Sequence, residues 1–297
     1  MEDSDAVGPP SLVEYDDDAA TTLAKARRNC IDAHIHLFGL IYHKPLALTR
    51  VNFTNVKGPL ESIMTLADMY GCSSLAVTHM ENHLSNFKTN IDVLIECYRN
   101  IPGMLDFSTK LRSAWMFRET MIHAVSDLRS PNEISETVDV SWLIEMKRSD
   151  LLQKMAKVDQ QLLLLVGYPK GEDTLVHVLA RAYFRDWFTH KLRKQGSSLR
   201  PGYAKVYRRI SRRKVPSIKK FQTFLEKAGR PENVSLQAFC GAVLDCFSQA
   251  LPFVQCLVSC SSTMRHAILA RGSGILSAPL TCVDIREDEL PWKERAW

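Results

Sequence analysis

Hydrophobic and polar positions alternate with a helical period along most of the chain. Apolar side chains recur at spacings of three, four and seven, which predicts helices over 60–70, 74–87, 90–100, 104–112 and 114–128. Gly71 ends the first of these helices, and Pro102-Gly103 ends the third. The last helix carries one apolar stripe, formed by Ala114, Phe117, Met121, Val125 and Leu128.

The clearest helical pattern covers residues 141–166. Its apolar positions are Ile144, Leu151, Met155, Val158, Leu162 and Leu165. Ser141 is the expected N-cap, and Gly167 and Pro169 end the helix. Further helices are expected over 172–194, 217–228 and 235–250, followed by an apolar segment at 251–269 and a short extended tail at 278–297. The predicted fold class is therefore mainly α, with few or no strands. Alternating strand–helix units are absent, which excludes an eight-stranded barrel.

Composition fits a soluble globular protein, with 45% hydrophobic and 24% charged residues. No apolar run approaches the ~18 residues that a membrane helix needs, so no membrane partner is expected. Eight cysteines occur without a CxxC pair, and we expect buried, reduced thiols.

The net charge of +5 is unevenly distributed. Residues 191–220 contain twelve Lys or Arg and no acidic residue, so the remaining residues hold 26 basic and 33 acidic side chains, a net of −7. Two basic clusters stand out in this stretch: Lys191, Arg193, Lys194, Arg208, Arg209, Arg212, Arg213 and Lys214. Such clusters can be read by nuclear import receptors or can contact phosphates. A solvated basic linker without a partner explains them equally well, and both interpretations stay open.

A carboxylate and two histidines, Asp32, His34 and His36, resemble the first ligands of a metal-dependent hydrolase. On a strand, residues i and i+2 point to one side and both imidazoles can reach one metal, whereas on a helix they diverge by about 200°. Over a wider window, Ile31, Ile35, Phe38 and Tyr42 form a helical stripe, so we predict a helix here. A hydrolase using the HxH at 34–36 remains an alternative only if residues 31–37 form a strand.

Other catalytic signatures are also missing from the sequence. His79 and His83 are four residues apart but lack the HExxH pattern, and neither GxSxG, GxGxxG nor GxxxxGK[ST] occurs. We therefore predict no enzyme activity, no catalytic or metal-binding residue and no cofactor.

"IMTLADMYGCSSLAVTHMENHL" (63–84) resembles the distal helices of the BTB/POZ domain in a large group of fungal proteins. "DFSTKLRSAWMFRETMIHAVSDL" (106–128) resembles the helical hairpin after it, and "LIEMKRSDLLQKMAKVDQQLLLLVGYP" (143–169) resembles the long helix that follows. Two further phrases of the group are matched at 185–194 and 280–292.

The resemblance implies a partial BTB/POZ-like domain, because the β-hairpin and two helices that precede residue 30 in a whole domain are expected to be missing. The expected segments are a disordered acidic N-terminus (1–29), a partial BTB/POZ-like helical region (30–100), a helical extension (101–195), a basic linker (196–220) and a C-terminal helical region with an extended tail (221–297).

The function that the resemblance implies is that of a non-enzymatic protein–protein interaction module, such as an adaptor. Its partners would be proteins, with a cullin-type ligase among the candidates, and self-association stays open. We expect a nuclear or cytoplasmic protein. A second alternative is a nuclear regulatory protein whose basic segment contacts nucleic acid, although nucleic acid is not the partner we expect.

Overall fold

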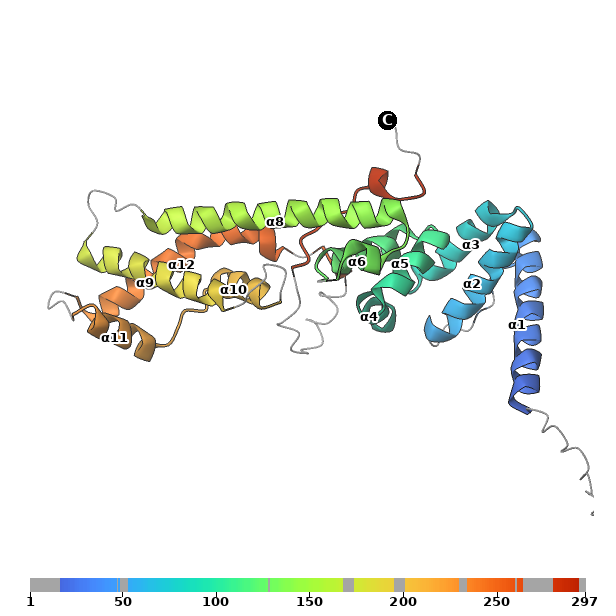
Figure 1. The fold of residues 1–297 in the computed structure, drawn as a ribbon, viewed down its shortest axis with the longest axis horizontal. Coiled ribbons are helices and arrows are strands. Elements are labelled where there is room, and N and C mark those ends of the chain that lie inside the picture. The colour runs from blue at the N-terminus through green and yellow to red at the C-terminus, as the bar shows by residue number, and fades with distance from the viewer. Residues whose placement is uncertain are drawn as a thin grey trace, which may run out of the picture. The chain divides into compact units, whose positions relative to one another are not determined.

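The computed structural model describes residues 17–46, 48, 53–127, 129–167, 174–194, 201–229, 234–259, 261–263 and 280–293. These residues form twelve α-helices and a 3-10 turn at Glu287–Glu289, with no strand among them (Figure 1). The prediction of a mainly α fold is therefore confirmed. The chain divides into two compact units, Met1–His83 and Leu84–Trp297, which differ from the five segments that the sequence suggested.

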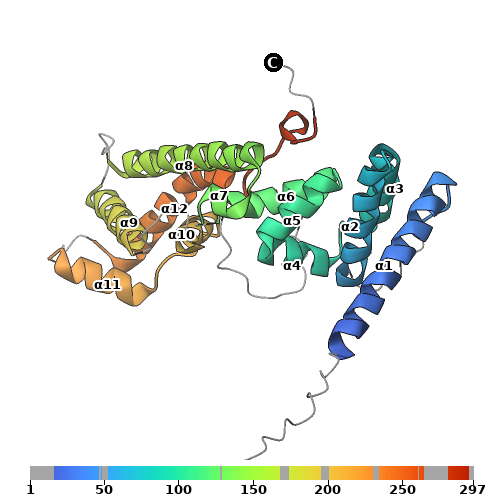
Figure 2. The same cartoon turned by 45° about the vertical axis from the view of Figure 1, so that its right-hand side comes forward.

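The first unit contains three helices: α1 (Asp17–Ile41), α2 (Phe53–Met69) and α3 (Ser73–Ser85). α1 packs along α2, and the two helices lie side by side in both views of the ribbon (Figures 1 and 2). Among the residues of α1 whose side chains are described, Ala33, Leu37 and Leu40 are buried. Their spacing of four and three residues defines the one face of α1 that belongs to the core.

The expectation of disorder over residues 1–29 is wrong for residues 17–29, because α1 begins at Asp17. The segment lacks aromatic residues, but it contains four alanines at positions 19, 20, 24 and 26, and alanine has the highest helix propensity. Residues 1–16 lie outside the described part of the chain.

The second unit begins with four shorter helices: α4 (Ile91–Arg99), α5 (Ile101–Lys110), α6 (Ala114–Val125) and α7 (Pro131–Ile134). Pro102 was expected to end a helix, but it lies in the first turn of α5, where its missing N–H costs no hydrogen bond. Asn100 separates α4 from α5, and its side chain accepts a hydrogen bond from the backbone N–H of Gly103. The predicted single break is thus a junction between two capped helices.

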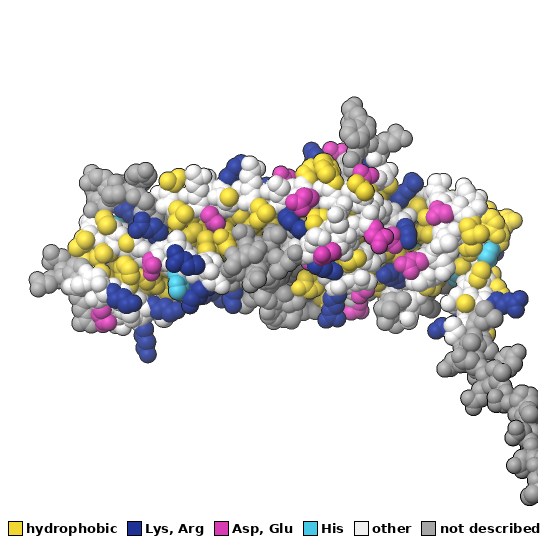
Figure 3. Space-filling view, in the orientation of Figure 1, with side chains coloured by type: hydrophobic (Ala, Val, Ile, Leu, Met, Phe, Trp, Pro, Cys, Tyr) yellow, Lys and Arg dark blue, Asp and Glu magenta, His cyan; other side chains and the backbone are white. Residues whose placement is uncertain are grey.

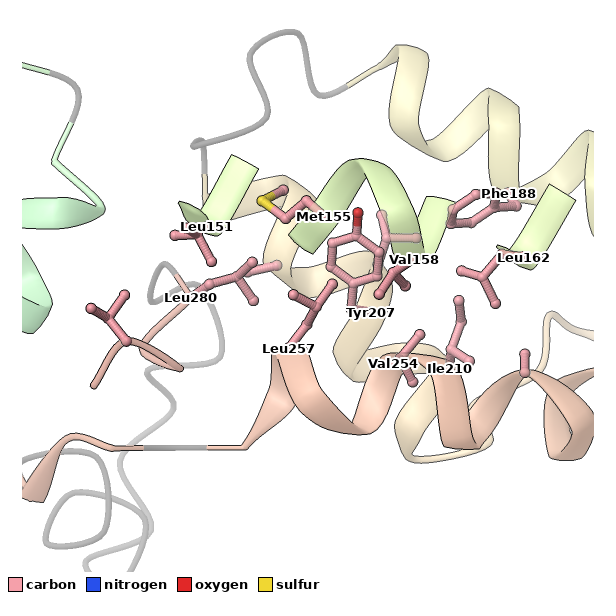
Figure 4. Packing of buried hydrophobic residues seen from close by; sticks show 14 of the residues in the cluster. Leu151, Met155, Val158, Leu162, Phe188, Tyr207, Ile210, Val254, Leu257 and Leu280 are labelled. Carbon is pink, nitrogen blue, oxygen red and sulfur yellow. The ribbon is translucent and has the colours of Figure 1, made fainter. Parts of the chain in front are cut away.

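Five helices form the rest of the second unit: α8 (Val138–Gly167), α9 (Leu175–Arg193), α10 (Pro201–Ser211), α11 (Ile218–Lys227) and α12 (Leu236–Val258). α12 contacts the other four. Figure 4 shows the core that they share, with side chains of α8, α10 and α12 pointing toward one another: Leu151, Met155, Val158, Leu162, Tyr207, Ile210, Val254 and Leu257. The apolar stripe that the sequence predicts on α8 is therefore the face that packs against α10 and α12.

Two boundaries in this unit differ from the sequence prediction. α8 begins at Val138, so Ser141 is not its N-cap, and the hydroxyl of Ser141 donates to the carbonyl of Val138 inside the first turn. The predicted basic linker at 196–220 is wrong for 201–211, which form α10, and for 218–220, which lie in the first turn of α11. Ala204, Tyr207 and Ile210 make a buried stripe there, which the dense Lys and Arg positions around it conceal in the sequence.

One described helix, α12, is long and apolar enough to cross a membrane by length and composition. Eight of its side chains are buried in the core of the second unit: Phe239, Ala242, Val243, Cys246, Phe247, Ala250, Val254 and Leu257. The apolar composition of α12 is accounted for by its position among four other helices.

Candidate interaction surface

An exposed apolar stripe runs along α1 on the side that does not pack on α2. It consists of Ile31, Ile35, Phe38 and Tyr42, spaced at four, three and four residues. Ile35 is 63% exposed and Tyr42 is 75% exposed. A surface helix of a globular protein carries polar side chains on its outer face, so α1 is unusual in being apolar on two faces.

The stripe continues at Tyr70, the residue after α2, and the exposed Met69 at the end of α2 precedes it. Met69 is 73% exposed and Tyr70 is 56% exposed, and the ring of Tyr70 lies 6.2 Å from that of Phe38. We call these side chains, together with the half-exposed Ile41, the α1–α2 surface: Ile31, Ile35, Phe38, Ile41, Tyr42, Met69 and Tyr70. Figure 3 shows yellow side chains gathered near the C-terminal end of α1, at the right of the view.

His34 holds Tyr70 against α1. Its Nδ1 donates to the backbone carbonyl of Cys30 at 2.8 Å, so in the neutral ring Nε2 is the acceptor. The hydroxyl of Tyr70 donates to this Nε2 at 3.3 Å. Both nitrogens of His34 are thereby used to fix an aromatic ring at the edge of the surface.

Local backbone structure fixes both edges of the surface. Two residues after α1, His43 has φ +56, and the N–H of Lys44 bonds to the carbonyl of Gly39 at 2.8 Å. Two residues after α2, Gly71 has φ +67, and the N–H of Cys72 bonds to the carbonyl of Ala67 at 2.8 Å. Both ends are Schellman caps, which satisfy terminal carbonyls and set the exit direction of the chain. The apolar side chains are thus presented by rigid helix ends.

The two histidines of the HxH pattern lie on α1, as the wider window predicted. Residues i and i+2 of a helix point in directions about 200° apart, so His34 and His36 cannot share one metal ion. Within the described residues, no group of three or more His, Cys, Asp or Glu side chains is placed to hold a metal. The geometry therefore gives no support to a hydrolase built on this pattern.

A buried polar cluster on α6 contains residue types that occur in catalytic sites. Ser262 donates to Glu119 Oε1 at 2.5 Å, the N–H of Thr263 donates to Oε2 at 2.8 Å, and His123 Nε2 lies 3.4 Å from Oε1. The serine hydroxyl thus bonds to the carboxylate and not to the imidazole that would have to activate it. Burial tends to raise the pKa of Glu119, but the nearby imidazole of His123 and the hydrogen bonds from Ser262 and Thr263 together outweigh burial and lower that pKa. The cluster anchors segment 261–263 on α6.

A small cavity lies between α8 and the C-terminal segment. Its volume is about 180 Å³, and its lining residues are Lys147, Asp150, Leu151, Lys154, Cys282, Val283, Asp284 and Arg286. Pockets for small molecules and cofactors measure roughly 300–1,000 Å³. This cavity is smaller than that range and gives no candidate ligand site.

The predicted basic residues are distributed over two helices and the turn after the second. Lys191 and Arg193 lie in the last turn of α9, and Lys194 follows it. Arg208 and Arg209 lie on α10, where Arg208 is only 5% exposed. The remaining three follow α10 and are exposed: Arg212, Arg213 and Lys214. Arg208 points into the protein, so its side chain is not placed for contact with a phosphate or an import receptor.

Comparison with known proteins assigns neither a family nor a function to the chain. No family model matches the chain, and neither a curated protein nor a solved structure matches it.

Proposed function

We propose that this protein is a non-enzymatic protein–protein interaction module of the BTB/POZ-like class and acts as an adaptor. The observation that carries the proposal is the α1–α2 surface, where seven large apolar side chains are between 38% and 75% exposed on two packed helices. Contiguous exposed apolar patches of this kind mark interaction sites, whereas single exposed apolar residues are ordinary.

The spacing of the stripe indicates how a partner would bind. Anchors at i, i+4, i+7 and i+11 on one helix are the pattern by which an amphipathic helix contacts an apolar groove. Phe38 within the stripe and Tyr70 at its edge add two neighbouring aromatic side chains, and aromatic residues dominate interface energetics. A protein partner with an apolar groove or helix is the expected occupant, and a cullin-type ligase subunit remains one candidate from the family resemblance.

The test is co-purification with matched variants of the full-length protein. Ile35→Glu with Phe38→Glu places two charges in the α1–α2 surface. Trp142→Glu with Leu164→Glu makes the same change at exposed apolar positions of α8, which are 55% and 52% exposed. Both variants should retain the helical circular dichroism of the wild type, because surface changes usually alter stability by less than about 0.5 kcal/mol.

A specific protein partner should co-purify with the wild type and the α8 variant and be lost from the α1 variant. Loss from both variants or from neither would show that the α1–α2 surface is not the binding site. Absence of any stoichiometric partner would refute the function proposed here.

A further inference from the structure

The N-terminal half of α1 packs against no other element among the described residues. Between Thr21 and Asp32, every side chain that the structure describes is exposed, and the first described side chain that is buried is Ala33. In Figure 1 the N-terminal end of α1 extends past the end of α2. Most helical stability in proteins comes from packing, and isolated helices shorter than about 12–15 residues are marginal in water. The exposed part of α1 is therefore available to a partner and would be stabilised by one.

The exposed stripe of α1 has the spacing of a coiled-coil seam. Its four residues, from Ile31 to Tyr42, follow one another at intervals of four, three and four. This is the alternation of d and a positions in a seven-residue heptad, abcdefg. Upstream, the same register places Arg28 at an a position and Ala24 at a d position. The buried residues of α1 fall at c and f, so α2 covers the side of the helix opposite the seam and leaves the seam open.

Two charged residues flank the seam. Arg27 is at a g position and Asp32 is at the next e position, and both are exposed. In the described part of the chain neither residue forms an ion pair. In a parallel pair of identical helices, a g residue of one helix lies beside the next e residue of the other. Arg27 of each copy would then meet Asp32 of the other copy.

An antiparallel pair does not match these charges. If it were centred on the stripe, it would place Asp32 beside the uncharged Gly39 of the other copy. Arg27 would lie beyond the last residue of the other α1, which is Ile41. Residues at e and g set the orientation of paired helices, so the charges of α1 favour the parallel arrangement.

We propose that the α1–α2 surface binds the same surface of a second copy of this chain, through a parallel two-stranded coiled coil of the two α1 helices. The inference rests on the proposed function, because it names the occupant of the same surface. The exposed apolar side chains of the two stripes bury one another in the seam. Two symmetry-related ion pairs between Arg27 and Asp32 fix the direction and the register of the helices.

Arg28 is the one charged residue at a seam position between Ala24 and Tyr42. In the parallel pair it meets Arg28 of the second copy. A charged residue at a single a position specifies the register of a coiled coil but lowers its stability. Replacing Arg28 by an apolar residue should therefore strengthen self-association, which is the opposite of what a substitution at an ordinary surface position does.

The first test is sedimentation equilibrium of the purified full-length protein. The wild type should form a dimer, and Arg28→Leu should tighten the dimer by at least about tenfold. Arg27→Leu is the matched control, because it makes the same change one residue away, outside the seam, and should not tighten the dimer. A wild type that stays monomeric at about 100 μM, or equal tightening by the two variants, would overturn the proposal.

The second test reverses the flanking charges. Arg27→Asp and Asp32→Arg each place like charges in both ion pairs and should weaken self-association by about tenfold. Lys88→Asp reverses an exposed cation after α3 and should leave self-association unchanged. A mixed dimer of the two α1 variants restores both ion pairs, so their equimolar mixture should associate as tightly as the wild type. A mixture no tighter than either variant alone would overturn the parallel arrangement.

Failure of this inference and failure of the proposed function give different results. If the purified protein is monomeric while another protein still co-purifies through the α1–α2 surface, the second copy is not the occupant and the proposed function stands. If neither a second copy nor another protein binds, both are refuted. Circular dichroism verifies that each variant keeps its helical content, as expected for changes confined to exposed residues.

Discussion

Arg148 of α8 caps the C-terminal end of α6 by hydrogen bonding to its last carbonyl groups. Its guanidinium donates four hydrogen bonds of 3.0–3.3 Å, to the carbonyls of Ala124, Val125, Asp127 and Arg129. The last carbonyls of a helix have no partner within the helix and need one elsewhere. A cation at this end also interacts favourably with the helix dipole. Arg148 is only 9% exposed, so water cannot readily replace it.

We predict that Arg148→Met strongly destabilises the second unit. Methionine keeps an unbranched apolar stem but removes every donor. A hydrogen bond to a charged group contributes about 1.5–3 kcal/mol, and the four bonds share one guanidinium and do not add independently. We therefore expect the free energy of unfolding to fall by about 3–5 kcal/mol, a large part of the roughly 5–15 kcal/mol that stabilises a typical protein.

The assay is urea unfolding followed by far-UV circular dichroism. Arg99→Met is the matched control, because Arg99 is exposed on α4 and should change stability by less than about 0.5 kcal/mol. Arg148→Lys keeps the charge but not the planar set of donors, and its effect should lie between the two. An Arg148→Met variant within about 1 kcal/mol of the control would refute the role assigned to this side chain.

Three other predictions concern acid stability, thiol reactivity and backbone conformation. The pKa of Glu119 is lowered in the folded state, so its stabilising contribution is full above its ordinary value of 4.5 and is lost as the pH falls below that value. Wild-type protein should therefore lose more stability on acidification than Glu119→Gln, and equal losses in urea titrations would contradict this. Iodoacetamide should alkylate the exposed Cys30 in the native protein but not Cys97, whose pKa burial raises to about 12, and mass spectrometry that finds equal rates would be inconsistent with this burial. Gly71→Ala should lower stability by about 1–2 kcal/mol because φ is +67, whereas Gly241→Ala in open space on α12 should stabilise, and thermal unfolding that ranks them in the opposite order would refute this.

The elements that the sequence predicted well are those whose apolar positions keep one period over many turns. α8 is the clearest case, because Leu151, Met155, Val158 and Leu162 lie at regular helical spacing and are all buried. α10 was not predicted, because charged residues interrupt its short apolar stripe. The density of Lys and Arg in this segment led to the prediction of a linker. Helix starts were the least accurate feature, as Ser141 illustrates, because a serine can cap a helix or bond within its first turn.

The α1–α2 surface was predictable from the sequence only in part. Ile31, Ile35, Phe38 and Tyr42 form a stripe that is visible in the sequence, but the spacing alone does not tell whether such a stripe is buried. Tyr70 joins it through a hydrogen bond with His34, across 36 positions of the sequence.

The most direct test of the central claim is site-specific photo-crosslinking from the α1–α2 surface. A photoreactive phenylalanine analogue replaces Phe38 in one sample and Trp142 of α8, another exposed aromatic residue, in the other. The account predicts a discrete crosslinked protein from position 38 that is lost when Ile35→Glu is added, and no such product from position 142. Identical crosslinking patterns from the two positions, or none from position 38, would contradict it.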